Sequence, residues 1–409
     1  MKRNVIVGQS GGPTAVINSS LAGVYKTAKD RGFHKIYGML HGIQGFLDEK
    51  YIDLSKYIKN DLDIELLKRT PSAFLGSCRF KLPEIHEDRE IYEKIFGILN
   101  KLDIDSFIYI GGNDSMDTIK KLSDYAILTG QTQKFVGVPK TIDNDLALTD
   151  HTPGFGSAAK YIGTSVKEII RDGLGLSYNK DIVTVVEIMG RNAGWLTGAA
   201  ALSKGEDCEG PDMIYLPELP FDMEKFLERV KNTLKKKHSV VIAVSEGIKL
   251  ADGRYVCELS ANSDYVDAFG HKQLSGTADY LANVIAAEIG CKTRGVEFST
   301  LQRSASHIAS RVDINEAFMV GGAAVKAADE GDTGKMVVID RVSDDPYQCA
   351  TGIYDVHKIA NDEKLVPREW ITRDGTYVTS DFIAYVKPLI QGDYPPVMVD
   401  GIPRHLIYK

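Results

Sequence analysis

The sequence contains little cysteine and no long apolar segment. Its 409 residues include five cysteines, an odd number without a CxxC spacing. These are Cys78, Cys208, Cys257, Cys291 and Cys349. We therefore expect reduced thiols in a cytoplasmic protein. No segment approaches the ~18 uninterrupted apolar residues of a membrane span, and the N-terminus leads directly into a short strand pattern, so we expect neither secretion nor contact with a membrane.

Long basic clusters and zinc-binding patterns are missing as well. The chain carries 49 basic and 56 acidic residues, a net charge of -7. Its densest basic cluster, 235–238, closes a helical pattern, where positive charge complements the helix dipole. We therefore expect no nucleic-acid partner. The nine histidines include no HExxH pair, which disfavours a zinc site.

What the sequence does contain is an alternation of apolar strands and helical segments. A length of 409 residues with 43% apolar content is enough for two or three domains. In the first half we expect strands at 5–7, 36–39, 107–110 and 135–138, with helices at 15–30 and 114–127. A second series has strands at 182–188, 213–216 and 239–244, with helices at 192–203, 222–236 and 276–289. A strand at 296–301, a helix at 314–329 and a strand at 335–340 follow.

This alternation predicts an α/β fold with two doubly wound, Rossmann-like lobes built on parallel sheets. The last 65 or so residues have weaker periodicity, so we expect an irregular C-terminal extension packed on the lobes. Our domain prediction assigns 1–145 and 303–345 to one lobe, 146–302 to the other and 346–409 to the extension.

Two glycine-rich turns join predicted strands to predicted helices. Glycines such as Gly11 and Gly12 let backbone N–H groups approach an anion at a helix N-terminus. The Walker pattern and a clean GxGxxG are both absent. A turn with a structural role only is therefore an alternative interpretation. The second turn, 111–115, adds Asn113 and Asp114, which suit Mg²⁺ beside a phosphate. A simple helix N-cap is the alternative.

A third polar segment, Pro139 to Asp145, follows the predicted strand 135–138. Ligands of open α/β sheets bind beyond the carboxyl ends of strands, and all three segments occupy such ends. A lysine, a threonine and two aspartates next to two glycine turns predict a site for phosphate chemistry.

These motifs resemble the phosphofructokinase family over roughly residues 4–340. Further matches are Gly76-Ser77-Cys78-Arg79-Phe80, Glu187 to Gly194, Ser245-Glu246-Gly247, and Arg294 with Gln302-Arg303. The resemblance implies Mg²⁺-dependent phosphoryl transfer to the 1-hydroxyl of fructose 6-phosphate, giving fructose 1,6-bisphosphate in a cleft between the lobes. It also implies a role in glycolysis and gluconeogenesis and a homodimer or homotetramer. The donor lobe would be 1–145 with 303–345, and the sugar-phosphate lobe 146–302.

Carried over by position, the resemblance assigns roles to individual residues. Asp143 would be the general base, a role that requires only hydrogen-bond reach to the sugar hydroxyl. Asp114 and Lys140 join it as catalytic residues. The residues matching the donor-phosphate site are Gly11, Gly12, Arg79, Gly112 and Ser115. Those matching the sugar-phosphate site are Thr141, Ile142, Asp143, Asp145, Met189, Gly190, Arg191, Glu246, Arg294 and Arg303. Metal ligation would fall to Asn113 and Asp114.

Two positions indicate which phosphoryl donor is used. In family members that use ATP, the second turn resembles Gly-Gly-Asp-Gly-Ser and the third segment resembles Pro-Gly-Thr-Ile-Asp. This chain has Asp114 where the second turn of those members has its last glycine, and Lys140 where their third segment has its glycine. An aspartate fills the volume of a nucleotide α-phosphate and repels it, and a lysine can neutralise a short donor in the transition state. Both changes match pyrophosphate-dependent members, so we expect pyrophosphate as donor and phosphate as product.

Other functions stay open as alternatives. An ATP-dependent phosphofructokinase is the nearest. A silent regulatory subunit is disfavoured because Asp143, Lys140, Arg79 and Arg191 are all retained. An NAD-dependent oxidoreductase lacks its glycine fingerprint.

Three positions depart from the family pattern. Asn113 replaces a usual acidic metal ligand. Ile182 stands where many relatives have an arginine donated across a subunit interface, and Thr300 stands where they have a histidine or tyrosine. The 6-phosphate shell would then be completed by His307, Lys180 or the C-terminal extension.

Overall fold

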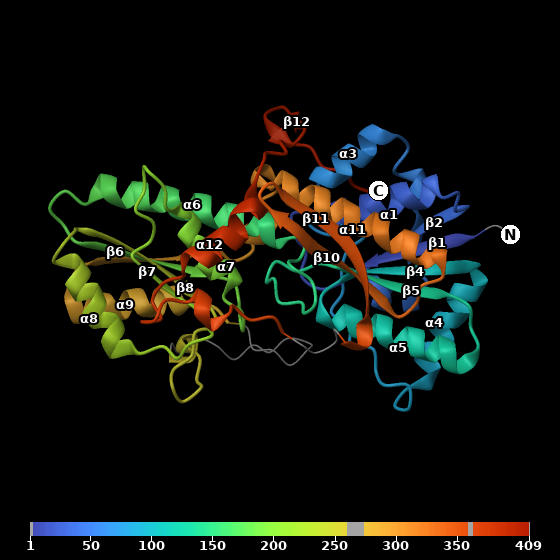
Figure 1. Ribbon diagram of the computed structural model, residues 1–409, viewed down its shortest axis with the longest axis horizontal. Coiled ribbons are helices and arrows are strands. Elements are labelled where there is room, and N and C mark those ends of the chain that lie inside the picture. The colour runs from blue at the N-terminus through green and yellow to red at the C-terminus, as the bar shows by residue number, and fades with distance from the viewer. Residues whose placement is uncertain (1–2, 260–273, 359–362, 409) are drawn as a thin grey trace.

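The computed structural model describes residues 3–259, 274–358 and 363–408, so the predicted ranges 1–145, 146–302 and 346–409 each include residues outside the description. Within the described residues, one sheet has the strand order β11-β10-β5-β4-β1-β2-β3 and a second has the order β7-β8-β6-β9. Figure 1 shows them in two lobes, side by side along the long axis of the molecule. The α/β fold with two parallel-sheet lobes is therefore confirmed.

The larger sheet is parallel at its centre and antiparallel at both edges. Its strands are β1 (Asn4–Gln9), β2 (Lys35–Met39), β3 (Tyr51–Asp53), β4 (Ile104–Gly111), β5 (Lys134–Pro139), β10 (Lys335–Asp344) and β11 (Tyr347–Asp355). The pairs β1–β2, β1–β4, β4–β5 and β5–β10 are parallel. Strands β3 and β11 run antiparallel to β2 and β10. The central strands therefore end at the same edge, which places their following loops together.

Helices cover both faces of this sheet because successive side chains of its central strands are apolar. Val5 and Val7 pack with α1 (Ile17–Asp30), α3 (Asp61–Arg69) and α11 (Arg311–Glu330). Ile6 faces α2 (Gly42–Leu47), α4 (Arg89–Lys101) and α5 (Asn113–Thr129). Helices α1 and α11 approach so closely that a Cβ on Gly23 would lie 2.0 Å from the Phe318 carbonyl oxygen. Such strands, buried on both faces, are typical of parallel sheets.

The smaller sheet has the same layered design. Its parallel strands are β6 (Ile182–Ile188), β7 (Met213–Tyr215), β8 (Ser239–Ser245) and β9 (Lys292–Glu297). One face packs on α6 (Phe155–Leu176) and α7 (Trp195–Gly198), and the other on α8 (Met223–Leu234) and α9 (Thr277–Ile289). Its carboxyl edge also carries loops that reach the space between the lobes. Among the described helices, none combines the length and apolar character needed to cross a membrane.

The C-terminal segment, described over residues 363–408, contacts both lobes. Trp195 of α7 stacks on Phe382 of α12 (Ser380–Val386) with ring centroids 5.9 Å apart. On the larger lobe, the Arg69 guanidinium lies 3.9 Å from the ring centroid of Tyr394. The remaining short elements are α10 (Leu301–Ser304), the two-stranded β12 (Met398–Val399) and β13 (Ile402–Pro403), and the 3-10 helices Leu54–Lys56, Ala199–Ser203, Val256–Leu259, Ser306–Ile308, Val356–Lys358, Arg368–Trp370 and Lys387–Ile390.

Three sequence predictions of local structure were wrong. The strand expected at 296–301 is β9 at 292–297, and it cannot continue because Ser299 adopts a left-handed φ of 42°. The helix expected at 192–203 begins only at Trp195 and becomes 3-10 after Gly198. The C-terminal extension is not wholly irregular, because β11 is a regular edge strand of the larger sheet. Its mostly exposed residues hide the alternation that identifies a half-buried strand.

Candidate active site

A cavity of about 720 Å³ lies where loops from the two sheets meet. The predicted site residues that line it from the larger lobe are Gly12, Arg79, Lys140, Thr141, Ile142, Asp143 and Asp145. Those that line it from the opposite side are Met189, Arg191, Glu246 and Arg303. All but Arg79 come after β1, β5, β6, β8 or β9 in the chain, and Arg79 lies in the loop between α3 and α4. The shared carboxyl edges of parallel strands therefore bring together residues that are distant in sequence.

Lys140 connects the ends of three neighbouring strands. Its side chain is buried at 3% exposure, and its Nζ donates to the Gly12 carbonyl oxygen at 2.7 Å. Its backbone N–H donates to the Gly111 carbonyl oxygen at 3.0 Å. Burial lowers the pKa of Lys140 to about 8, although Asp143 and Asp145 oppose this shift. The amino group of Lys140 therefore lies at the first glycine turn, and its backbone lies at the second.

The first glycine turn also holds the segment that carries Arg79. The Gly11 N–H donates to the Cys78 carbonyl oxygen at 3.1 Å, and Ser77 Oγ donates to the Gly11 carbonyl oxygen at 2.6 Å. Gly11 has a φ of 75°, which favours glycine, and a Cβ there would lie 3.2 Å from Lys140 Nζ. The first glycine turn therefore lies beside Lys140 Nζ and is hydrogen-bonded to the segment that carries Arg79.

Asp143 is partly buried beside these cations. Its backbone N–H donates to Thr141 Oγ1 at 3.1 Å. Burial raises the pKa of the Asp143 carboxyl, while the positive charges of Lys140, Arg303 and Arg191 act in the opposite direction. A carboxyl group in such surroundings can accept a proton from a hydroxyl group that enters the cavity.

A second acidic residue lies two positions further along the loop. Burial, reinforced by the charge of Asp143, raises the pKa of Asp145 to about 7. The Asp145 carbonyl oxygen accepts from the Lys364 N–H at 2.8 Å. The C-terminal segment therefore touches the loop that bears both carboxyl groups.

The opposite wall of the cavity combines acidic and basic groups. Glu246 Oε1 accepts from the Gly190 N–H at 3.3 Å, and burial together with Asp143 raises the pKa of Glu246 to about 8. Arg303 reaches across to the first glycine turn, because a Cβ on Gly12 would lie 3.2 Å from its Nη1. Burial, then Arg79, lowers the pKa of Arg303. This arginine therefore faces the predicted donor side as well as the predicted sugar side.

Several of the predicted site residues are not among the residues that line the cavity. Gly11, Gly112, Ser115 and Gly190 are not among its lining residues, and Asn113, Asp114 and Ser115 form the start of α5. Arg294 is exposed on β9 and pairs with Asp172 at 3.8 Å. Ile182 begins β6, at the end of the strand away from the site. Thr300 does line the cavity, whereas Lys180 and His307 lie outside its described lining.

The structure adds residues that sequence reasoning did not select for the site. Glu187 and Glu297 line the cavity at the ends of β6 and β9. The rule that ligands bind at the carboxyl ends of strands could have identified both. Glu363 also lines it and accepts from Asn192 Nδ2 at 2.9 Å. Because Glu363 comes from the C-terminal segment, no local motif indicates it.

The donor atoms near the site fit Mg²⁺ that arrives with phosphate oxygens. The described residues contain no group of three or more His, Cys, Asp or Glu side chains able to hold a metal ion. Asn113 Oδ1, however, is buried with no hydrogen-bond partner in the described structure, and Asp143 and Asp145 line the cavity. Mg²⁺ commonly uses one or two carboxylates plus substrate phosphates. This donor set is compatible with that mode of binding.

Two α/β lobes, cations at glycine turns and a carboxyl group beside them are typical of an enzyme of the phosphoryl-transfer class. The family model described as Phosphofructokinase matches residues 4–328. The chain belongs to the phosphofructokinase family.

Relatives match over nearly the whole chain. A protein of Xanthomonas campestris named pyrophosphate–fructose 6-phosphate 1-phosphotransferase is 41% identical, covering 99% of this chain and 96% of its own. A protein of the same name from Halomonas elongata is 40% identical, covering 98% and 95%. The crystal structure of a pyrophosphate-dependent phosphofructokinase from Nitrosospira multiformis has a TM-score of 0.89 at 38% identity, covering 99% and 96%.

Proposed function

We propose that this protein transfers a phosphoryl group reversibly from pyrophosphate to the 1-hydroxyl of fructose 6-phosphate, giving fructose 1,6-bisphosphate and phosphate. The observation that carries the proposal is the buried Lys140, whose Nζ lies 2.7 Å from the Gly12 carbonyl oxygen, beside Asp143 in one cavity. Relatives about 40% identical over the whole chain are named for this reaction. ATP-dependent phosphofructokinase activity is the alternative.

The proposed chemistry uses the two sides of the cavity differently. The oxygen of the 1-hydroxyl attacks the nearer phosphorus of pyrophosphate, and the bond from that phosphorus to the bridging oxygen breaks. Asp143 accepts the hydroxyl proton, and phosphate leaves with the bridging oxygen. Lys140 stabilises the charge that develops on the transferring group and on the leaving phosphate, and Arg303 binds the phosphate of the sugar. The reverse reaction uses the same groups, with Asp143 returning the proton.

The remaining roles follow the sequence predictions. Thr141, Met189, Arg191 and Glu246 would orient the sugar. Gly12 and Arg79, together with Gly11, Gly112 and Ser115, would hold the donor. Arg294 lies outside this cavity in a single chain, so its proposed contact with the sugar phosphate belongs to a homodimer or homotetramer.

Magnesium is part of the proposal. Asn113 and Asp114, with Asp143 or Asp145, would hold Mg²⁺ together with the substrate phosphates. When bound, the ion neutralises phosphate oxygens during transfer. The unpartnered Asn113 Oδ1 supports this assignment.

The domain roles and the location of the protein are proposals too. We assign 1–145 with 303–345 to donor binding, 146–302 to sugar binding and 346–409 to an extension packed on both. The free cysteines fit a reducing, cytoplasmic setting.

The test compares donors directly. Purified protein is supplied with fructose 6-phosphate, Mg²⁺ and either pyrophosphate or ATP, and formation of fructose 1,6-bisphosphate is measured. We expect rapid formation with pyrophosphate and little with ATP. Asp143→Asn is the control for contaminating activity. A higher kcat/KM with ATP would support the alternative, and activity with neither donor would refute both.

A further inference from the structure

The residue between the two cavity aspartates is held by the C-terminal segment. Asn144 is fully buried and adopts a left-handed φ of 55°. Its Nδ2 donates to the Tyr385 hydroxyl at 3.0 Å. Its Oδ1 accepts from the Thr152 N–H at 3.1 Å and from Lys364 Nζ at 3.4 Å. Both ends of this amide are therefore engaged, and two of its partners lie more than 200 residues away in sequence.

Tyr385 connects this amide to a fixed aromatic group. Its hydroxyl donates to the Asp150 carbonyl oxygen at 2.5 Å, so one oxygen contacts both ends of the segment 144–150. The ring of Tyr385 lies 5.2 Å from both Trp195 and Trp370, measured between centroids. The hydroxyl is therefore held by packing against the smaller lobe.

Lys364 makes a second connection to the same loop. Its Nζ donates to the carbonyl oxygens of Thr149, at 3.3 Å, and of Asp150. Its backbone N–H donates to the Asp145 carbonyl oxygen, and its own carbonyl oxygen accepts from Trp195 Nε1 at 2.8 Å. Lys364 therefore joins the aspartate loop of one lobe to α7 of the other.

We propose that Lys364 and Tyr385 are positioning residues that hold the loop 143–150 so that Asp143 and Asp145 face the substrates. Neither side chain lines the cavity as described, so each acts through Asn144 and the loop backbone. Catalytic groups require placement within a fraction of an ångström, and their supporting hydrogen bonds set that placement.

The electrostatics of Lys364 agree with this role. Burial lowers the pKa of Lys364 to about 8, while Asp150 and Asp145 raise it. A cation held partly out of water needs these fixed carbonyl and carboxyl partners. The loop conformation that satisfies Lys364 is thus the one that presents the two aspartates.

The C-terminal segment offers a matched control. Tyr377 also has a buried hydroxyl, but that oxygen has no hydrogen-bond partner in the described structure. Tyr385→Phe and Tyr377→Phe each remove one hydroxyl from the same segment. We expect Tyr385→Phe to lower kcat by about 10- to 100-fold with less than about a twofold change in either KM, and Tyr377→Phe to leave both constants unchanged.

Lys364→Met supplies a second variant, at a residue whose Nζ also donates to the Tyr385 hydroxyl at 3.4 Å. If Lys364 and Tyr385 support one loop, the double variant with Tyr385→Phe loses less than the product of the two single losses. Multiplicative losses would contradict a shared function. A loss that appears only in KM for Tyr385→Phe would contradict positioning of the aspartates.

This inference rests on the proposed function for its kinetic readout, so a second measurement works without substrate. Hydrogen exchange of the peptide spanning 141–152 is compared among wild type, Tyr385→Phe and Tyr377→Phe. We expect at least about tenfold faster exchange in Tyr385→Phe alone. Equal exchange in all three proteins would overturn the inference. Absence of transfer activity in wild type would refute only the proposed function.

Discussion

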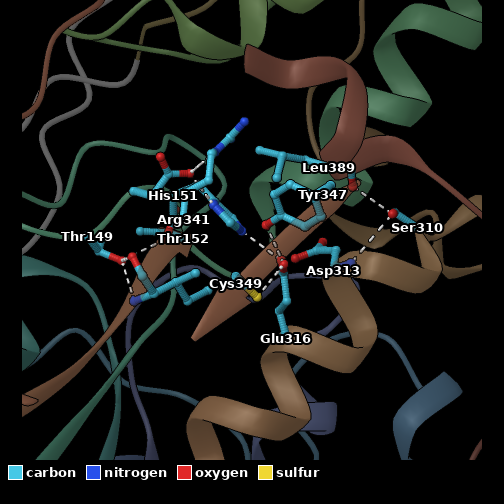
Figure 2. A network of polar contacts seen from close by, with 12 residues as sticks. Thr149, His151, Thr152, Ser310, Asp313, Glu316, Arg341, Tyr347, Cys349 and Leu389 are labelled. Carbon is cyan, nitrogen blue, oxygen red and sulfur yellow. Dashed lines mark hydrogen bonds and ion pairs between the residues drawn. The ribbon is translucent and has the colours of Figure 1, made fainter. Parts of the chain in front are cut away.

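The pH dependence of stability should depend strongly on His151. This imidazole is 1% exposed and lies between two carboxylates, with Nδ1 2.7 Å from Asp150 Oδ2 and Nε2 2.7 Å from Glu316 Oε2. Figure 2 shows the imidazole directed toward Glu316, which Tyr347 and Cys349 also approach. Burial lowers the pKa of His151, but the charges and hydrogen bonds of Glu316 and Asp150 outweigh it and raise the pKa to about 9.

The size of the effect follows from this pKa. A histidine whose pKa rises from 6.5 in the unfolded chain to about 9 in the folded protein contributes about 3 kcal/mol to the free energy of unfolding. Because the folded state binds the proton more tightly, this contribution is fully present below pH 6.5. It is lost as the pH rises through about 9.

The assay compares wild type with His151→Gln, which cannot take up the proton. Urea unfolding is followed by fluorescence of Trp195 and Trp370, which lie 6.0 Å apart near the lobe contact. We expect the difference in unfolding free energy between the two proteins to shrink by about 3 kcal/mol from pH 6 to pH 9.5.

Other groups with a shifted pKa, such as Lys140 and Glu246, are present in both proteins and cancel in this difference. Arg341, which pairs with Asp150, keeps its charge throughout this range. A difference between wild type and variant that stays constant from pH 6 to pH 9.5 would refute the assignment of a protonated His151.

Three further predictions concern the reaction. Asp143→Asn lowers kcat by at least ~100-fold with little change in KM, because it removes the proton acceptor; steady-state kinetics with kcat equal to wild type would remove Asp143 from the mechanism. Arg303→Ala raises KM for fructose 6-phosphate, because it removes a charge-assisted contact with the sugar phosphate. A rise limited to KM for pyrophosphate would instead place this arginine on the donor side. Lys140→Gly severely lowers turnover with pyrophosphate. The double variant that also carries Asp114→Gly has a higher ratio of ATP to pyrophosphate activity than either single variant. An unchanged ratio would contradict the role of Asp114 and Lys140 as donor selectors.

Motifs at strand ends made much of the site predictable. Strands β1 and β5 are short apolar runs buried on both faces, so their periodicity is readable in the chain. Parallel strands carry their following loops to one edge. Gly12, Lys140 and Asp143 could therefore be placed together from the amino-acid sequence alone, and the ordered motifs around them were enough to indicate the family.

The C-terminal segment shows where this reasoning ends. The exposed edge strand β11 and the cavity residue Glu363 lack any local pattern that reveals their place. Lys364 and Tyr385 reach the aspartate loop across more than 200 residues of chain. Local sequence indicated which residues line the cavity, because strands, turns and helices follow short-range patterns. Tertiary packing alone decided what holds those residues in place, because contacts between distant, irregular segments depend on how the two lobes and the extension fit together.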